Sequence, residues 1–298
     1  MTQKRLLILV AHPDDESFGS GGTIARYVAE GAEVHVVIAT DGAAGSVVEE
    51  YANERERLVE IRDKELETAV SILGATLHKL NYRDSGYIGD PANSHPDAFI
   101  QCDIEEGTRR VVALIRQIRP QVVMTHDPTG GYFHPDHIQC NKITTPAFYA
   151  AGDAKQYPDI GPAPYQPQKL YFGAFPNRWI KFFTFLMRLR GQDPKKMGRN
   201  KDIDMTRLGY PRKKVHTLVN YSRYWDIKKE ASAAHASQGG GGGGARGGLL
   251  PEWIQRRWLA NEMYIRAHPP TPDGYSEKDL FAGVDLSETV TNQARLGD

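Results

Sequence analysis

A run of six apolar residues close to the N-terminus ends abruptly in charged side chains, and this junction constrains the fold more than any other part of the sequence. The run spans residues 6–11 and is followed by His12, Asp14 and Asp15. Its length and continuity indicate a strand that is buried on both faces, as in a parallel sheet. Ligands of open α/β sheets bind in the crevice beyond the carboxyl ends of the strands. We therefore expect an α/β fold with a functional site at the end of this strand.

A second polar cluster, the tetrapeptide H-P-D-H at residues 134–137, follows a second apolar run at residues 122–124. Pro13 fixes its own φ angle and favours an extended His12, which helps to aim His12 and Asp15 at a common point. Neutral imidazole and carboxylate oxygen are the usual ligands of a catalytic zinc ion, and three protein ligands leave a position for water. The two clusters together therefore predict a metal site.

These two motifs resemble those of a known enzyme superfamily. A-H-P-D-D-E at residues 11–16 and H-P-D-H at residues 134–137 are similar to the motifs of the PIG-L/LmbE-like zinc de-N-acetylases, which include the mycothiol and bacillithiol pathway deacetylases. Each motif alone is a weak signal, whereas the pair, each placed after a strand, is specific. The resemblance implies a metal-dependent hydrolase that removes an N-acetyl group from a GlcNAc-containing small molecule, with a metal-bound water attacking the amide.

The resemblance also implies the metal ligands and the general base. His12, Asp15 and His137 match the zinc ligands, and the same donor set suits Fe²⁺. Asp14 is the adjacent carboxylate that ligation does not need, so we expect it to act as the general base and later as the general acid. We expect Glu16 to hydrogen-bond neighbouring groups rather than to ligate the metal.

Further catalytic groups are implied next to the second motif. In the resembling family the matching histidine, here His134, is cationic, is oriented by the matching aspartate, here Asp136, and stabilises the tetrahedral oxyanion. Tyr132 resembles a tyrosine that assists at the same oxygen. Loss of one oxyanion donor lowers turnover by on the order of 10²–10³. Phe133 stands where some relatives carry glycine, which makes the shape of this loop a point of difference.

The same resemblance gives four candidate substrate ligands: Arg62, Asp84, His235 and Gln238. Two of them have an alternative interpretation. Arg62 shares a helix face with Glu65, and a surface ion pair between them would contribute little. Asp84 stands before Ser-Gly, an ordinary place for a turn-capping aspartate. The position of Asp84 at the end of a strand favours binding.

A glycine cluster after the first motif raises the alternative of a dinucleotide-binding turn. The glycines stand at positions 19, 21 and 22 and fit the G-x-G-x-x-G spacing poorly. The acidic residues 14–16 would also repel a pyrophosphate. We therefore interpret the cluster as a place where backbones pack closely beneath a metal site.

Strand-like and helix-like segments alternate along the chain. We expect further strands at residues 33–40, 77–80, 121–125, 169–175 and 216–219, and helices at 23–30, 48–73, 103–118, 134–149 and 224–237. This alternation predicts a Rossmann-like layered α/β fold with a largely parallel central sheet. We expect residues 1–298 to form a single de-N-acetylase domain with an apolar and basic insertion at about 177–214 and a flexible glycine-rich loop at 239–248.

The insertion contains an unusually aromatic segment at residues 179–189, which is too short to span a bilayer. A lid, a subunit contact and a peripheral membrane patch are all open, and the lack of a dense basic face favours the first two. The basic residues of 195–214 are expected in a mobile solvated loop, with contact to a phosphate as the alternative.

Composition limits the partners and the compartment. Lysine plus arginine equal aspartate plus glutamate at 37 each, so no overall charge favours nucleic acid or an anionic membrane. Two cysteines, with no signal-peptide pattern and no transmembrane segment, predict a reduced, cytoplasmic location. The expected partner is a small amino-sugar substrate, and a homo-oligomer is left open. Two alternatives remain: an amidase acting on a glucosamine–thiol conjugate, and a noncatalytic sugar- or nucleotide-binding protein.

Overall fold

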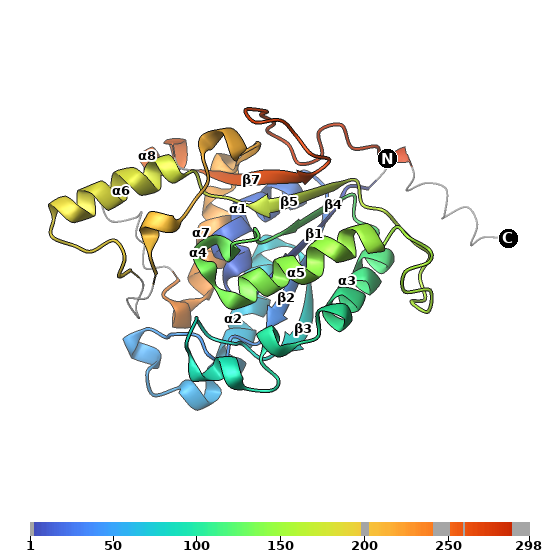
Figure 1. Cartoon of the computed structure of the whole chain (residues 1–298). Helices are drawn as coiled ribbons and strands as arrows, with labels where there is room; N and C mark the ends of the chain where they lie inside the picture. The colour runs from blue at the N-terminus through green and yellow to red at the C-terminus, as the bar shows by residue number, and fades with distance from the viewer. Residues whose placement is uncertain (1–2, 198–202, 241–250, 259, 288–298) are drawn as a thin grey trace.

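A seven-stranded sheet with the order β3-β2-β1-β4-β5-β7-β6 forms the centre of the molecule (Figure 1). The computed structural model describes residues 3–197, 203–240, 251–258 and 260–287. Neighbouring strands pair in parallel from β3 to β5, whereas β7 runs antiparallel to both of its neighbours. The strands are β1 (Arg5–Val10), β2 (Glu33–Thr40), β3 (Thr76–Tyr82), β4 (Val122–Thr125), β5 (Lys169–Gly173), β6 (Thr217–Asn220) and β7 (Asn261–His268).

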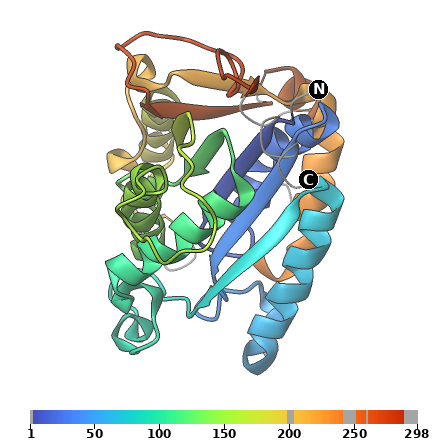
Figure 2. The same cartoon turned by 90° about the vertical axis from the view of Figure 1, so that its right-hand side faces the viewer.

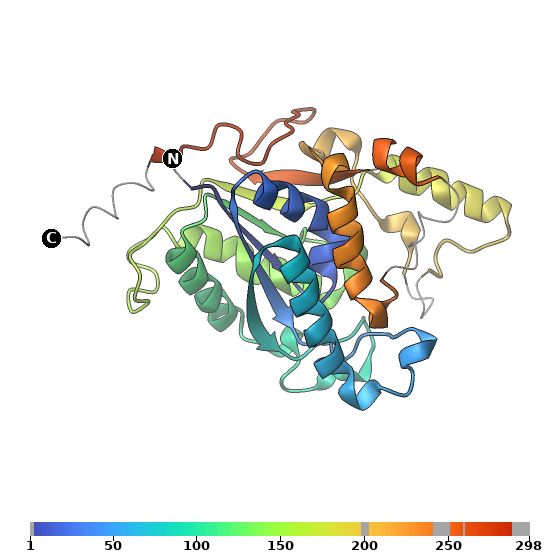
Figure 3. The same ribbon diagram turned by 180° about the vertical axis from the view of Figure 1, so that it is seen from behind.

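Helices cover both faces of the sheet (Figures 2 and 3). One face packs against α1 (Asp15–Ala29), α2 (Leu58–Leu73) and α7 (Trp225–Ala234), and the other against α3 (Ile104–Ile118) and α5 (Pro135–Ala150). In β1, Leu6 and Ile8 belong to the first of these cores, and Leu7 and Leu9 to the second. Successive side chains of a strand point to opposite faces, which explains why the first apolar run has no polar residue. The predicted layered α/β fold with a largely parallel sheet is confirmed.

Several helix boundaries differ from the predictions. α1 begins at Asp15 rather than at residue 23. α2 begins at Leu58 rather than at residue 48, because the mostly charged residues 49–57 offer no apolar face to pack and form two short 3₁₀ turns. α7 ends at Ala234. The remaining α-helices of the described ranges are α4 (Gly130–Phe133), α6 (Asn177–Leu189) and α8 (Glu252–Trp258).

The glycine cluster lies inside α1, so it does not form a phosphate-binding turn. A Cβ atom on Gly22 would overlap the ring of Tyr221, which packs directly against the helix backbone. The cluster is therefore a place of close backbone approach, as the sequence indicates. From residue 241 onward the predicted glycine-rich loop lies outside the described residues, as do residues 198–202 of the basic segment. Within the described ranges, no helix has both the length and the apolarity to cross a membrane.

The strand order places one crevice at the carboxyl ends of β1 and β4. The chain runs outward from β1 through β2 to β3, and then crosses back to β4 on the other side of β1. Such a reversal of strand order leaves the loops after β1 and β4 open to a ligand. The loops after these two strands carry the two polar motifs.

Candidate active site and metal centre

Three side chains expected to ligate a metal meet at the end of β1. Nδ1 of His12 lies 3.4 Å from Oδ2 of Asp15 and 3.2 Å from Nε2 of His137, and the last two atoms are 3.3 Å apart. A tetrahedral zinc ion holds its ligands at about 2.0–2.1 Å, which places neighbouring ligand atoms roughly 3.3 Å from one another. The three donors therefore form one face of a tetrahedron of the size that zinc requires.

The electrostatic environment of two of these donors, Asp15 and His137, suits a cation. Burial alone would raise the pKa of Asp15, but the imidazoles of His137, His12 and His126 outweigh it and hold that pKa well below its usual range. Burial lowers the pKa of His137 to about 4, with Asp15 offsetting part of the effect. Asp15 is thus ionised and His137 neutral near neutral pH, and these are the forms that bind a metal ion. Burial would lower the pKa of the third donor, His12, but the carboxylates of Asp84, Asp136 and Asp15 outweigh it and raise that pKa, so a metal ion would displace a proton from His12.

Asp14 lies beside these donors in an unusual backbone conformation, with φ at 144°. Non-glycine residues rarely adopt such angles, and they persist where the surrounding structure holds them. Here Glu16 holds the backbone, because its Oε2 accepts a hydrogen bond from the Asp14 N–H at 2.9 Å. Burial raises the pKa of the Asp14 carboxyl to about 7, although Arg62 reduces the effect. A carboxyl with this pKa can both accept and donate a proton at neutral pH.

Arg62 reaches Asp14 from α2 instead of pairing with Glu65. Its buried guanidinium donates to Oδ2 of Asp14 at 3.1 Å and to the carbonyl oxygens of Pro13 and Gly42. A Cβ atom at position 42 would lie 2.6 Å from Cζ of Arg62, so only glycine lets the guanidinium pass. The surface ion pair is therefore excluded, since Glu65 instead accepts hydrogen bonds at residue 237.

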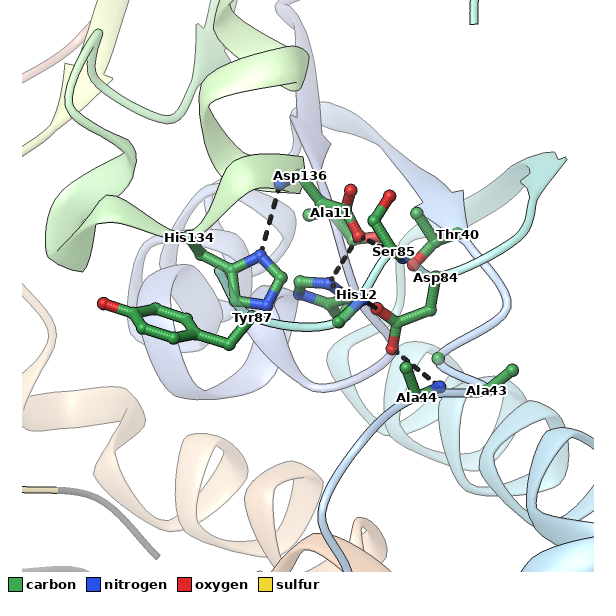
Figure 4. Close-up of polar contacts among 12 residues, drawn as sticks. Ala11, His12, Thr40, Ala43, Ala44, Asp84, Ser85, Tyr87, His134 and Asp136 are labelled. Atoms are coloured by element: carbon green, nitrogen blue, oxygen red, sulfur yellow. Dashed lines mark hydrogen bonds and ion pairs between the residues drawn. The ribbon is translucent and has the colours of Figure 1, made fainter. Parts of the chain in front are cut away.

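Asp136 contacts a different histidine from the one expected (Figure 4). Its carboxylate lies 3.3 Å from Nε2 of His12 and accepts the N–H of Ser85. His134 caps the N-terminus of α5, and its Nδ1 accepts the backbone N–H of Asp136. The prediction that the Asp136 carboxylate orients His134 is therefore wrong, because the cap geometry turns the two side chains apart. The backbone of Asp136 fixes the His134 ring instead.

The environment of His134 favours a neutral ring in place of the expected cation. Burial and the neighbouring rings of His12 and His137 all lower its pKa. With Nδ1 accepting a hydrogen bond, the neutral ring carries its proton on Nε2, which is then a donor. Tyr132 contacts the ring of His134 edge-on at 5.7 Å, and burial raises the pKa of its phenol, so that it too remains a donor.

Asp84 is the turn-capping aspartate, and its carboxylate also lies beside His12. Its carboxylate accepts the N–H of Gly86, as a turn cap does, and also the N–H of Ala44 (Figure 4). Oδ1 lies 3.6 Å from Nε2 of His12, so the same carboxylate borders the site. Burial would raise the pKa of Asp84, but His12 outweighs it and lowers that pKa.

Comparisons with known proteins agree with this geometry. A profile of the GlcNAc-PI de-N-acetylase (PIG-L) family matches residues 7–148. A 1D-myo-inositol 2-acetamido-2-deoxy-alpha-D-glucopyranoside deacetylase from Thermobifida fusca is 38% identical over 296 residues, which cover 95% of this chain and 100% of the relative. The protein of the same name from Rhodococcus jostii is 36% identical over 95% of this chain and 99% of its own length.

The chain belongs to the PIG-L family.

Solved structures share the fold of this PIG-L protein. An N,N'-diacetylchitobiose deacetylase from Pyrococcus horikoshii has a TM-score of 0.57 at 22% identity, covering 88% of this chain and 83% of the other. The 4-carboxy-2-hydroxymuconate hydratase GalB from a Pseudomonas has a TM-score of 0.56 at 17% identity, covering 91% and 99%. The fold thus occurs with more than one reaction. The relatives of higher identity bear out the predicted hydrolase that removes an N-acetyl group from a GlcNAc-containing small molecule.

Two of the expected substrate ligands, His235 and Gln238, lie in the segment that follows α7 in this PIG-L protein. His235 is fully buried, and its Nε2 is 2.7 Å from Oε1 of Glu16, the residue that holds the Asp14 backbone. Ser17 donates to the same carboxylate oxygen. Gln238 donates to the hydroxyl of the preceding serine. Glu16 therefore hydrogen-bonds neighbouring groups, as predicted, and connects the loop after α7 to the base.

One site residue was not predicted from the sequence. His126 stacks on His137 with ring centroids 3.8 Å apart, and its Nε2 lies 3.6 Å from Oδ2 of Asp15. The same nitrogen accepts the N–H of Ala11. The available signal was its position immediately after β4, at the carboxyl end of a strand. His126 joins Asp15 and His137 as one of the residue groups whose donor atoms all lie within 4.8 Å of each other.

Proposed function

We propose that this protein removes the acetyl group from the GlcNAc unit of 1D-myo-inositol 2-acetamido-2-deoxy-alpha-D-glucopyranoside. The proposal rests on one observation: a chain that aligns over 95% of its length with deacetylases of that name brings together three metal donors and an adjacent carboxyl with a pKa of about 7. Membership of the PIG-L family supports deacetylation as the reaction. Hydrolysis of an amide needs an activated water and a proton-transfer group, and the metal donors and Asp14 fit these two requirements.

We propose Zn²⁺ as the cofactor, held by His12, Asp15 and His137, and the same donors also suit Fe²⁺. The spacing of the three donor atoms supports this choice. Such an ion, when bound, acts as a Lewis acid and lowers the pKa of a coordinated water to about 7. Buried, partly desolvated imidazoles strengthen the case for a resident cation.

The protein's own groups supply the proton transfers. Asp14 removes a proton from the attacking water and returns it to the leaving amine, and Arg62 holds the carboxylate in place. Nε2 of His134 and the hydroxyl of Tyr132 donate to the oxyanion, while Asp136 orients His12.

The sugar-binding assignments remain part of this proposal. We propose Arg62 and Asp84 as contributors to the sugar site because Arg62 contacts Asp14 and the Asp84 carboxylate lies 3.6 Å from Nε2 of His12. His235 and Gln238 act on the same pocket through Glu16 and the loop after α7. We also propose a cytoplasmic location and a single domain over residues 1–298, the former supported by two free cysteines, Cys102 and Cys140.

A glucosamine–thiol amidase is the second candidate, and the names of the relatives favour the deacetylase over it. A noncatalytic binder would not need a base with a pKa near 7. The deciding experiment measures formation of the free glucosamine amine from the inositol conjugate, from N,N'-diacetylchitobiose and from an N-acyl glucosamine–thiol conjugate. We expect the fastest reaction with the inositol conjugate and loss of activity with a chelator. Preference for the thiol conjugate would overturn the substrate, and chelator-resistant turnover would overturn the metal.

A further inference from the structure

Helix α6 presents an apolar stripe to solvent instead of to the core. Phe182, Phe185 and Leu189 lie on one face because they are three and seven residues apart, and they are 50%, 56% and 69% exposed. Among the side chains of α6 that the structure describes, the polar Thr184 is the buried one. A surface helix of a globular protein normally has the opposite arrangement. The helix lies at the periphery, away from the sheet (Figure 1).

Basic residues accompany this stripe. Residues 177–197 contain six lysines and arginines and one acidic residue, in a chain whose charges balance overall at 37 each. Lys181 and Arg188 are exposed, and they lie on the same flank of the stripe because they are seven residues apart. Arg190 is exposed directly after the helix. Within the ranges that the structure describes, none of these three forms an ion pair.

We propose that α6 binds the surface of an anionic lipid bilayer. An amphipathic helix with phenylalanine and leucine on one side and basic residues on its flank lies in the plane of the interface, with its apolar face among the acyl chains. Basic residues close to an anionic surface add electrostatic attraction. The sequence alone favoured a lid or a subunit contact, but the observed outward stripe and the exposed cations after the helix fit a bilayer better.

Charge argues against a second copy of the chain as the occupant. A twofold interface places the same patch on both sides, so the cations around Lys181 and Arg188 would face one another. Interface cores are also depleted of charged residues. A nucleic acid would satisfy the cations, but the aliphatic Leu189 offers no ring on which a base can stack. An anionic bilayer offers acyl chains to the apolar stripe and negative headgroups to the basic residues.

The helix is tied to the rim of the active site. Tyr210 hydrogen-bonds the backbone of Phe175 and Asn177 at the start of α6, and its hydroxyl donates to Asp127 in the loop after β4. Arg207 lies over the ring of Phe133, 4.4 Å from its centroid. Docking of α6 therefore fixes the orientation of the site relative to the bilayer, whichever reaction the site performs.

Vesicle sedimentation with the full chain tests the proposal. The vesicles contain phosphatidylcholine alone or phosphatidylcholine with phosphatidylglycerol. We expect sedimentation with the anionic vesicles, weakened by salt, and none with phosphatidylcholine alone. Three serine substitutions, Phe182→Ser, Phe185→Ser and Leu189→Ser, should weaken partitioning at least about tenfold. Val59→Ser with Tyr149→Ser is the matched control, because both residues are exposed apolar side chains on other helices.

A charge-reversal set separates electrostatic from apolar binding. Each basic residue near an anionic surface contributes roughly fivefold, so Lys181→Glu, Arg188→Glu and Arg190→Glu together should weaken partitioning by at least about a hundredfold. Lys142→Glu, Lys155→Glu and Arg223→Glu reverse three exposed charges elsewhere and should leave it unchanged. Thermal melts verify that the variants are folded. No binding to anionic vesicles, equal loss in the control sets, or a concentration-dependent dimer that only the serine set disrupts would each overturn the proposal.

Discussion

The guanidinium of Arg62 donates a hydrogen bond to Oδ2 of Asp14 over 3.1 Å, from a helix that begins more than forty residues later in the chain. This contact places a buried cation directly behind the proposed base. It opposes the effect of burial on the Asp14 carboxyl, whose pKa is about 7. The pKa of Asp14 therefore reflects burial, which raises it, and the Arg62 charge, which lowers it.

Replacement of the base should separate catalysis from metal binding. Asp14→Asn keeps the three donor residues, so we expect an unchanged metal content and a loss of turnover on the order of 10²–10⁴. Acetate release and elemental analysis of the same preparation measure the two quantities. Full activity in this variant would refute the role of Asp14.

Loss of the arginine should move the pH profile as well as the rate. Without the Arg62 charge, the pKa of Asp14 rises further, because Arg62 lowers it in the folded protein. The acidic limb of kcat/KM should therefore shift to higher pH in Arg62→Gln. Lys64→Gln, an exposed neighbour on the same helix, is the control. A decrease in kcat/KM at every pH, with no shift of the acidic limb, would show that Arg62 contributes to substrate binding or to folding and not to the pKa of Asp14.

A donor variant should lose the metal. We expect His137→Ala to contain much less zinc than the unmodified protein, because two remaining donors cannot replace a three-ligand site. Elemental analysis after dialysis provides the measurement. His95→Ala, a partly exposed histidine outside the donor set that lies beside Asp97, should retain its zinc. Equal zinc in both variants would rule out ligation by His137.

The buried pair of His235 and Glu16 should make stability depend on pH. Burial would lower the pKa of His235, but Glu16 outweighs it, so the folded-state pKa lies above that of the unfolded chain. The pair's contribution is therefore complete below about pH 6.5 and is lost as the pH rises through the folded-state pKa. Urea unfolding of the unmodified protein and of His235→Gln should differ more at about pH 6 than at about pH 9. A difference that is constant with pH would exclude this linkage.

Local patterns were sufficient for the residues at strand ends. His12 and Asp15 follow β1 within a few residues, and His137 lies in the first turn of α5. The position of the two motifs after strands predicted a metal site, and the family resemblance supplied the set of three donors. Arg62 was placed on the correct helix, but its partner was not predicted. Arg62 reaches its partner, Asp14, only because the absence of a side chain at Gly42 leaves room for the guanidinium, and this close approach arises when the loops pack together.

Partners that depend on tertiary structure could not be found in this way. His126 reaches Asp15 only because β1 and β4 are adjacent in the sheet. The carboxylate of Asp136 turns to His12 because the cap at His134 uses the backbone N–H. Phe133 adopts a φ of 68°, which favours glycine, and the Arg207 guanidinium packs over its ring. None of these contacts has a periodic signal in the sequence.

His12 and His137 are 125 residues apart in the chain, and their ring nitrogens meet only after the sheet has assembled. An ion that needs both rings has affinity for the native chain and little for the denatured one, so its binding adds directly to the free energy of unfolding. The lifetime of the protein in a cell would then follow the local supply of free zinc, and a shortage of metal would remove the enzyme by degradation as well as by inactivation.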